Sequence, residues 1–258
     1  MPEPETLHVA LCTAVAFAAG WIDAMAGGGG ILTVPAIASF GLPMPVVGGT
    51  NKVVGTSGSV TATLTFLSKG KVERRIAVLG AATAAVGAVF GALALARLGR
   101  ADERLAGMIF GGLLVAVALH MFFRKSLGGE SAYAGPTARN LAITAAAGIL
   151  IGFYDGFFGP GTGSFLVFVM VRFLRFDYVV GTGNAKCMNF GSNIASLATF
   201  MAMGLVVWPV AIPMAAANAA GSWCGSRMAI AKGAGFIRWV FLAAAVAVAA
   251  RLVGTLVR

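Results

Sequence analysis

Four charged residues interrupt long apolar stretches of this sequence: Asp23, Lys52, Asp155 and Lys186. A charged side chain at the centre of a membrane-spanning helix costs at least about 2.5 to 3.5 kcal/mol, so each marks a candidate functional position. Their formal charges sum to zero. Two interpretations stay open at this point: the aspartates and lysines neutralise one another, in either pairing, or the lysines hold a ligand.

Glycine-rich runs follow both aspartates. Residues 27–30 are four consecutive glycines, and residues 159–163 read Gly-Pro-Gly-Thr-Gly. Each run precedes a short apolar segment that we expect to be a half-helix. Free N–H groups and about half a positive charge at its N-terminus attract anions, and glycine lets a ligand approach the backbone closely. Neither run has the GxxxxGK[ST] spacing of a phosphate-binding loop.

Polar clusters open the helix that follows each half-helix. We predict that the lysines supply charge near the membrane midplane, while hydroxyl and amide groups supply hydrogen bonds to a ligand. The predicted substrate-binding residues are Gly28, Gly29, Gly30, Thr50, Asn51, Lys52, Gly161, Thr162, Gly163, Thr182, Asn184, Lys186 and Asn189. Asp23 and Asp155 are predicted to pair charges or to carry a coupled proton.

The chemistry of this set favours a small oxyanion bound at a cationic site. No cluster of histidine or carboxylate ligands accompanies it, and no broad aromatic platform does, so neither a metal nor a sugar is expected. No nucleophile, base and orienting group gather in the sequence, which predicts a protein that is not an enzyme. No cofactor is expected.

The composition indicates a membrane protein. Hydrophobic residues make up 59% of the 258 residues and charged residues only 11%, against about 25% charged residues in a soluble domain. The net charge of +10 comes from lysines and arginines in short clusters between apolar segments. These clusters are typical of topology signals and not of a nucleic-acid interface. Residues 1–258 are expected to form a single membrane domain.

The chain contains an internal repeat. Asp23 matches Asp155 at an offset of 132, whereas residues 65–72 match 199–206, and the Gly87-x-x-x-Gly91 pair matches Gly221-x-x-x-Gly225, at an offset of 134. We therefore expect two residues to be inserted in the second half, near residues 49–52 and their counterpart 181–186. The Gly-x-x-x-Gly pairs predict close helix contacts. The first half covers about residues 7–123 and the second about 137–257.

An all-α polytopic fold follows from the apolar segments. Each half is expected to contain a re-entrant hairpin, broken at its glycine run, and three further helices. In the first half the segments are about 7–26, 31–41, 50–68, 73–96 and 103–123; in the second they are about 137–158, 164–175, 183–203, 206–230 and 234–257. The short segments reach only about 16 to 18 Å, against a hydrocarbon thickness of about 30 Å.

The loop charges favour inverted halves. With a periplasmic N-terminus and three net crossings per half, twelve positive residues lie on the cytoplasmic side and five outside, in the direction of the positive-inside rule. The twelve are Lys69, Lys71, Arg74, Arg75, Arg124, Lys125, Arg139, Arg172, Arg175, Arg227, Lys232 and Arg238. The five are Arg97, Arg100, Arg104, Arg251 and Arg258. A parallel arrangement weakens this bias.

The combined motifs resemble the sulfite exporter TauE/SafE family of membrane transporter proteins. They are Gly20-x-x-Asp23-x-x-x-Gly27-Gly28-Gly29-Gly30-x-Leu32-x-x-Pro35, Gly49-Thr50-Asn51-Lys52, Gly152-Phe153-Tyr154-Asp155-Gly156-Phe157-Phe158-Gly159-Pro160-Gly161-Thr162-Gly163 and Asn184-x-Lys186-x-x-Asn189. The resemblance implies a multi-pass permease of the bacterial inner membrane, related to exporters of sulfite and organosulfonates.

The expected function is secondary transport, in the export direction, of a small sulfur oxyanion, with a coupled proton as one option. The alternative is a passive anion channel that uses the same cationic constriction without coupling. The expected partners are the anion and the lipid bilayer, without nucleic acid. The sequence leaves open the exact substrate, the coupling ion and the oligomeric state.

Overall fold

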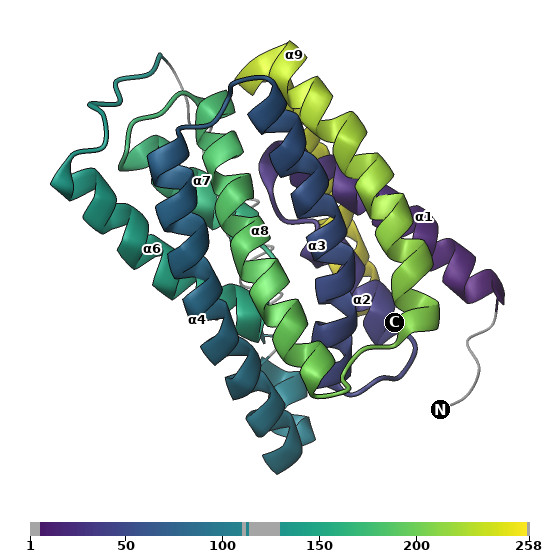
Figure 1. Ribbon diagram of the computed structural model, residues 1–258. Coiled ribbons are helices and arrows are strands. Elements are labelled where there is room, and N and C mark those ends of the chain that lie inside the picture. Colours follow the sequence, from purple (N-terminus) through teal and green to yellow (C-terminus); the bar gives the residue numbers. More distant parts are fainter. Residues whose placement is uncertain (1–5, 110–111, 114–129, 257–258) are drawn as a thin grey trace.

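The computed structural model describes residues 6–109, 112–113 and 130–256, with side chains placed up to residue 233. Its elements in chain order are α1 (Thr6–Ala26), α2 (Gly30–Ala38), α3 (Met44–Ser68), α4 (Arg74–Ala101), α6 (Ala138–Phe157), α7 (Thr162–Arg172), α8 (Tyr178–Ala202) and α9 (Trp208–Leu256) (Figure 1). The described residues contain no strand, so the all-helical prediction is confirmed. The predicted helix 103–123 and the basic residues Arg124 and Lys125 lie largely outside the described residues.

Helices α3 and α8 begin five or six residues before their predicted starts. Glycines near both starts favour a loop on propensity alone. Tertiary packing overrides this propensity and extends both helices. A Cβ on Gly49 would lie 2.0 Å from the carbonyl oxygen of Leu205, and one on Gly183 would lie 2.1 Å from that of Lys71. The glycines thus let each helix start pass close to a neighbouring backbone. Helix α9 joins two predicted helices across a kink at Gly233, whose φ is 66°.

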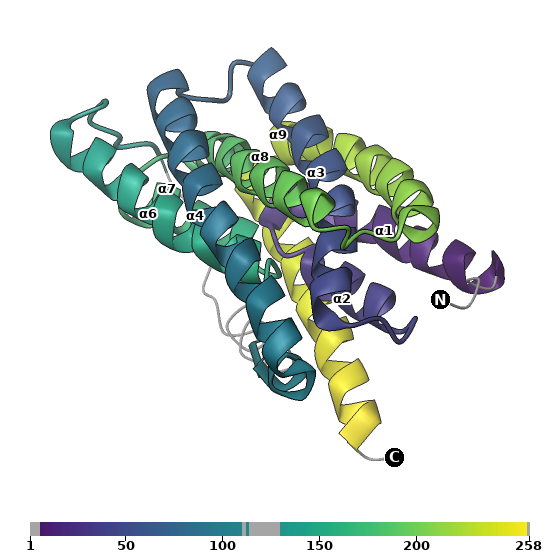
Figure 2. The same ribbon diagram turned by 60° about the horizontal axis from the view of Figure 1, so that its bottom comes forward.

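Long helices pack in two matching pairs, α1 against α9 and α6 against α4 (Figures 1 and 2). The Gly-x-x-x-Gly pairs lie at these contacts. A Cβ on Gly91 would lie 2.0 Å from the carbonyl oxygen of Phe153, and one on Gly225 would lie 2.2 Å from that of Trp21. Close approach of the backbones therefore requires glycine in both pairs, as the sequence predicts.

The centre of the bundle is formed by α3 and α8, which lie side by side between α4 and α9 (Figure 1). They are antiparallel, since Phe200 near the end of α8 packs on Gly49 near the start of α3, and Phe66 near the end of α3 packs on Gly183 near the start of α8. Most of the buried polar side chains come from these two helices. They position the candidate site.

Each short helix turns back along the helix before it. His8 at the start of α1 stacks on Phe40 just after α2, with ring centroids 4.0 Å apart. In the second half, Tyr133 before α6 stacks on Phe176 after α7, also at 4.0 Å. Helices α1 and α2 therefore form one antiparallel hairpin, and α6 and α7 form another.

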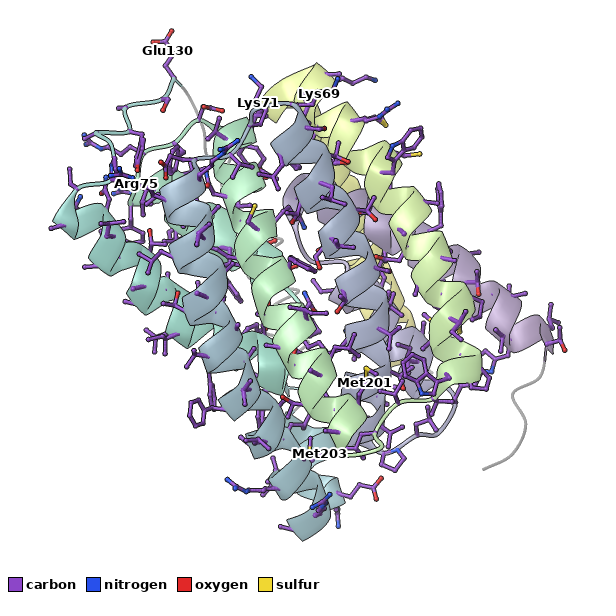
Figure 3. The ribbon with its side chains drawn as sticks, in the orientation of Figure 1. Lys69, Lys71, Arg75, Glu130, Met201 and Met203 are labelled. Atoms are coloured by element: carbon purple, nitrogen blue, oxygen red, sulfur yellow. The ribbon has the colours of Figure 1, made fainter. Side chains whose placement is uncertain are left out.

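The outside of the bundle is apolar, and polar side chains are buried at its centre. Large hydrophobic side chains are exposed along α3, α4, α6 and α9, including Leu64, Phe90, Leu150 and Ile212, each at least 60% exposed. Among the described helices, α1, α4 and α6 are long and apolar enough to cross a membrane. Figure 3 shows Lys69, Lys71 and Arg75 at one end of the bundle, here called the basic end, and Met201 and Met203 at the other. This pattern is that of an integral membrane protein.

Candidate functional site

Both buried lysines form ion pairs with an aspartate from the opposite half of the chain. Lys52 Nζ on α3 lies 2.9 Å from Asp155 Oδ2 on α6. Lys186 Nζ on α8 lies 2.7 Å from Asp23 Oδ2 on α1. Of the two pairings that the sequence left open, the structure therefore has the one between halves. The four charges balance, so the site is neutral overall and differs in this respect from the cationic site expected.

The pair of Lys52 and Asp155 is sealed. Their side chains are 3% and 2% exposed. Asn193 Oδ1 accepts a hydrogen bond from Lys52 Nζ at 3.2 Å, and Ser192 Oγ donates to Asp155 Oδ2 at 2.6 Å. Burial without such partners is costly, so these bonds fix the pair in place.

The glycine-rich breaks of the two hairpins lie against each other. Gly27 and Gly159 have φ values of 76° and 94°, a region that glycine enters without strain. A Cβ on Gly27 would lie 2.2 Å from the backbone nitrogen of Ser164, whose hydroxyl donates to the carbonyl oxygen of Ala26 at 2.8 Å. The end of α1 and the start of α7 thus meet at one point inside the bundle.

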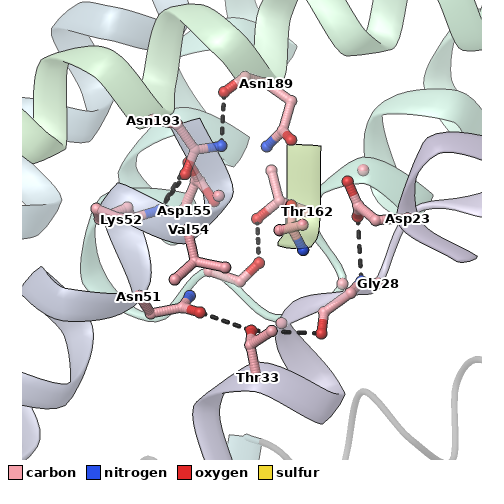
Figure 4. A pocket seen from close by; sticks show the side chains of 17 residues that line it. Asp23, Gly28, Thr33, Asn51, Lys52, Val54, Asp155, Thr162, Asn189 and Asn193 are labelled. Atoms are coloured by element: carbon pink, nitrogen blue, oxygen red, sulfur yellow. Dashed lines mark hydrogen bonds and ion pairs between the residues drawn. The ribbon is translucent and has the colours of Figure 1, made fainter. Parts of the chain in front are cut away.

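A polar cavity of about 40 Å³ opens where these elements converge (Figure 4). A single water needs roughly 10 to 15 Å³ on this scale, so the cavity holds a few waters or a small ion. The predicted site residues that line it are Asp23, Gly28, Gly29, Gly30, Asn51, Lys52, Asp155, Gly161, Thr162, Gly163 and Asn189. Lys186 lies directly behind Asp23.

Three predicted ligand residues make structural contacts away from the cavity lining. Thr50 Oγ1 accepts a hydrogen bond from the backbone nitrogen of Val207 at 3.0 Å, and Asn184 Oδ1 accepts one from that of Glu73 at 3.2 Å. Thr182 Oγ1 donates to the carbonyl oxygen of Tyr178 at 2.7 Å. Thr50 and Asn184 thus tie helix starts together, Thr182 bonds within α8, and none of the three lines the cavity.

Sequence reasoning missed several lining residues: Thr33, Val54, Gly55, Gly159, Asn193 and Asn218. One signal was available, because Asn193 follows Lys186 and Asn189 at a spacing that places all three on one face of a helix. Thr33 gave no such signal in an apolar segment. It donates to Asn51 Oδ1 at 2.6 Å and so orients that amide in the cavity (Figure 4).

Asn189 differs from the other asparagines of the cavity, Asn51, Asn193 and Asn218, whose side chains form hydrogen bonds with the protein. It is 6% exposed and its side chain points into the cavity (Figure 4). Within the part of the chain that the structure describes, its backbone carbonyl accepts hydrogen bonds from Ser192 and Asn193, but its side-chain amide has no protein partner. The amide is not among the fully buried polar atoms without a partner, so it faces the cavity space, where water or a ligand can satisfy it.

Two buried apolar clusters pack the bundle around the helix starts. One surrounds Phe200 and the start of α3, and the other surrounds Phe66 and the start of α8. Both phenylalanines are fully buried. A bundle of apolar helices around a charge-paired polar cavity defines an integral membrane protein with an interior site.

Comparison with known proteins identifies the kind of membrane protein. The family model described as sulfite exporter TauE/SafE matches residues 12–252. A probable membrane transporter protein, ORF9, from Sinorhizobium is 39% identical over 237 residues, covering 92% of this chain and 89% of that protein. The probable membrane transporter protein YfcA of Escherichia coli K12 is 34% identical over 238 residues, covering 92% and 87%. No solved structure matches the chain.

The protein is therefore a membrane transporter, and the resemblance read from its motifs is confirmed. It belongs to the sulfite exporter TauE/SafE family.

Proposed function

We propose that the protein is a secondary transporter that exports a small oxyanion, such as sulfite or an organosulfonate, across the bacterial inner membrane. The observation that carries this proposal is the convergence of Lys52, the unpartnered amide of Asn189 and both glycine-rich breaks on one small cavity, with Lys186 paired to Asp23 behind it. Ammonium, amide and backbone N–H groups are all donors, which suits the oxygens of an anion. The family description agrees with such a cargo.

The proposed transport mechanism uses two inverted repeats. Residues 134 apart make the same contacts: Gly91 faces α6 as Gly225 faces α1, and Phe66 packs on α8 as Phe200 packs on α3. Figure 3 supports inversion, because Lys69 and its counterpart Met203 lie at opposite ends of the bundle. Inverted repeats allow alternating access by rocking one half against the other around a fixed central site.

The proposed orientation places the basic end in the cytoplasm and the N-terminus in the periplasm. Helices α2 and α7, of 9 and 11 residues, then reach only about 14 to 17 Å into the bilayer. Each acts as the second arm of a re-entrant hairpin. The broken backbone is satisfied because the two hairpin tips cover each other inside the protein.

The internal repeat supports a transporter over a passive channel, because two repeats that rock against each other let the cargo enter from one side at a time. The relatives described as probable membrane transporter proteins agree with this choice.

Flux measurements in proteoliposomes test the proposal. Liposomes loaded with unlabelled sulfite should take up labelled sulfite by exchange, with saturation, and excess chloride should not compete. Empty liposomes with an acidic exterior should accumulate the anion. Leak that is linear in concentration would contradict the transporter and favour the channel, and absence of sulfite and sulfonate flux would contradict the cargo.

A further inference from the structure

The two ion pairs of the site are chemically alike but differently exposed. Lys52 and Asp155 are both sealed, whereas Asp23 is 22% exposed and its partner Lys186 is fully buried. Asp23 lines the cavity and Lys186 lies behind it. Of the two lysines, Lys52 therefore lines the cavity itself, whereas the carboxylate of Asp23 separates Lys186 from any cavity occupant.

The carboxylate of Asp23 occupies two donors that would suit an anion. Its Oδ2 accepts from Lys186 Nζ at 2.7 Å, and its Oδ1 accepts from the backbone nitrogen of Gly29 at 3.1 Å. Gly29 is the N-cap of α2, where the helix dipole favours negative charge. A sulfonate or sulfite group would be held in the same way, because two of its oxygens would each accept from a separate donor.

We propose that the carboxylate of Asp23 competes with the cargo for the donors on Lys186 and Gly29. The ionised carboxylate keeps the anion from these donors until a proton neutralises Asp23. This inference rests on the proposed function and names the regulation of the same site. When the proton adds to a carboxylate oxygen of Asp23, Lys186 keeps its charge and loses its counter-ion. An oxyanion then takes the vacated donors, so one proton and one anion bind together.

Asn189 completes the proposed binding position. It lies one turn beyond Lys186 on the same face of α8, and its unpartnered amide points into the cavity that Asp23 also lines (Figure 4). An anion that replaces the carboxylate would accept from this amide as well. The free amide therefore indicates a position for an external ligand that the resting ion pairs leave unfilled.

The surroundings of Asp23 contain no second group that would take this proton in its place. Among the described residues, the other charged groups at the cavity are Lys52 on α3, Asp155 on α6 and Lys186 on α8. Helices α2, α7 and α9 contribute backbone N–H, hydroxyl and amide groups there. Asp155 also lines the cavity, but its carboxylate is only 2% exposed and already accepts from Lys52 and Ser192.

Coupled binding of a proton and an anion determines which gradients drive transport. A monovalent anion and a proton that cross together carry no net charge, so the membrane potential does no work on the pair. Export then follows an excess of cargo in the cytoplasm over the opposing proton gradient.

Methanesulfonate binding to the purified full-length protein tests the proposal, because this anion stays monovalent across the working pH range. In the wild type, affinity should rise about tenfold for each unit of pH decrease where Asp23 is ionised, with about one proton taken up per anion. In Asp23→Asn, affinity should be at least as high as in the wild type at low pH and should not vary with pH. Glu103→Gln, which removes an exposed carboxylate outside the cavity, is the matched comparison and should keep the pH slope.

Several outcomes would overturn the inference. One is a pH slope that persists in Asp23→Asn, and another is loss of methanesulfonate binding in that variant while the wild type binds. If Asp23→Asn does not fold, the test is the proton uptake that accompanies methanesulfonate binding to the wild type. Binding of the anion without proton uptake contradicts the proposal. If neither sulfite nor methanesulfonate binds the wild type at any pH, the proposed function itself fails, together with the inference.

Discussion

Thr50 and Asn184 hold the same position in the two halves of the protein and make the same kind of hydrogen bond. Each accepts from the backbone nitrogen just before a long helix of the other half, Thr50 from Val207 before α9 and Asn184 from Glu73 before α4. Both residue pairs are related by an offset of 134. The two additional residues of the second half therefore precede Thr50 and Asn184, earlier than the sequence comparison alone suggests.

Replacing Thr50 with valine should destabilise the protein without affecting its ligand. Valine keeps the shape of threonine but leaves the backbone nitrogen of Val207 without an acceptor, which costs about 1 to 3 kcal/mol. The expected result is a lower unfolding midpoint in detergent and unchanged affinity for sulfite or methanesulfonate. Weaker binding with an unchanged midpoint would return Thr50 to the ligand-binding set.

The sealed ion pair should behave as a structural unit. Removing one partner, in Lys52→Met or Asp155→Leu, leaves an uncompensated buried charge and should cost about 3 to 5 kcal/mol. The double variant should regain most of that stability, since both charges leave together. Folded yield and unfolding midpoints of the four proteins form a double-mutant cycle. Additive losses would show that the two charges do not interact.

The contact between α4 and α6 should depend on the absence of a side chain at Gly91. Alanine there places a Cβ against the carbonyl oxygen of Phe153 and should lower stability by about 1 to 3 kcal/mol. Gly107 provides the control, because no described atom lies within 4 Å of a Cβ built on it. Gly107→Ala should leave stability unchanged or slightly higher. Equal effects of both substitutions would argue against close packing of these helices.

Single cysteines at equivalent positions of the two halves should report inversion directly. Ser68 and Ala202 are both exposed helix ends and lie 134 residues apart. In a background whose native cysteines are replaced, a membrane-impermeant maleimide added to intact cells should label Ala202→Cys and not Ser68→Cys. Labelling of both, or of neither until the cells are lysed, would indicate parallel halves.

The sequence was sufficient to predict most of the helices and the place of the site. Charges and glycine runs stand out against apolar stretches, so Asp23, Asp155 and both breaks could be located by composition and spacing. The early starts of α3 and α8 could not be located in this way. Glycine is unfavourable in an isolated helix, and here each helix start is stabilised by contact with a backbone distant in sequence.

The roles of individual polar residues could not be predicted, because they depend on how each helix is rotated about its own axis. Thr50 and Asn51 are adjacent in sequence, yet one bonds a neighbouring backbone and the other lines the cavity. Asn218 reaches the cavity from α9, where it donates to the carbonyl oxygen of Ala16. Nothing in its local sequence predicts that position, since the packing of α9 on α1 determines it.

The most direct test of an oxyanion site in this cavity is the affinity of Asn189→Ala for methanesulfonate, measured by calorimetry at the pH where the wild type binds best. Asn189 has no side-chain partner among the described residues, so its removal should leave the unfolding midpoint unchanged. Loss of one hydrogen bond to a charged ligand is worth about 1.5 to 3 kcal/mol, so affinity should fall about 10- to 100-fold. Wild-type affinity in a folded Asn189→Ala protein would contradict binding of the anion in this cavity.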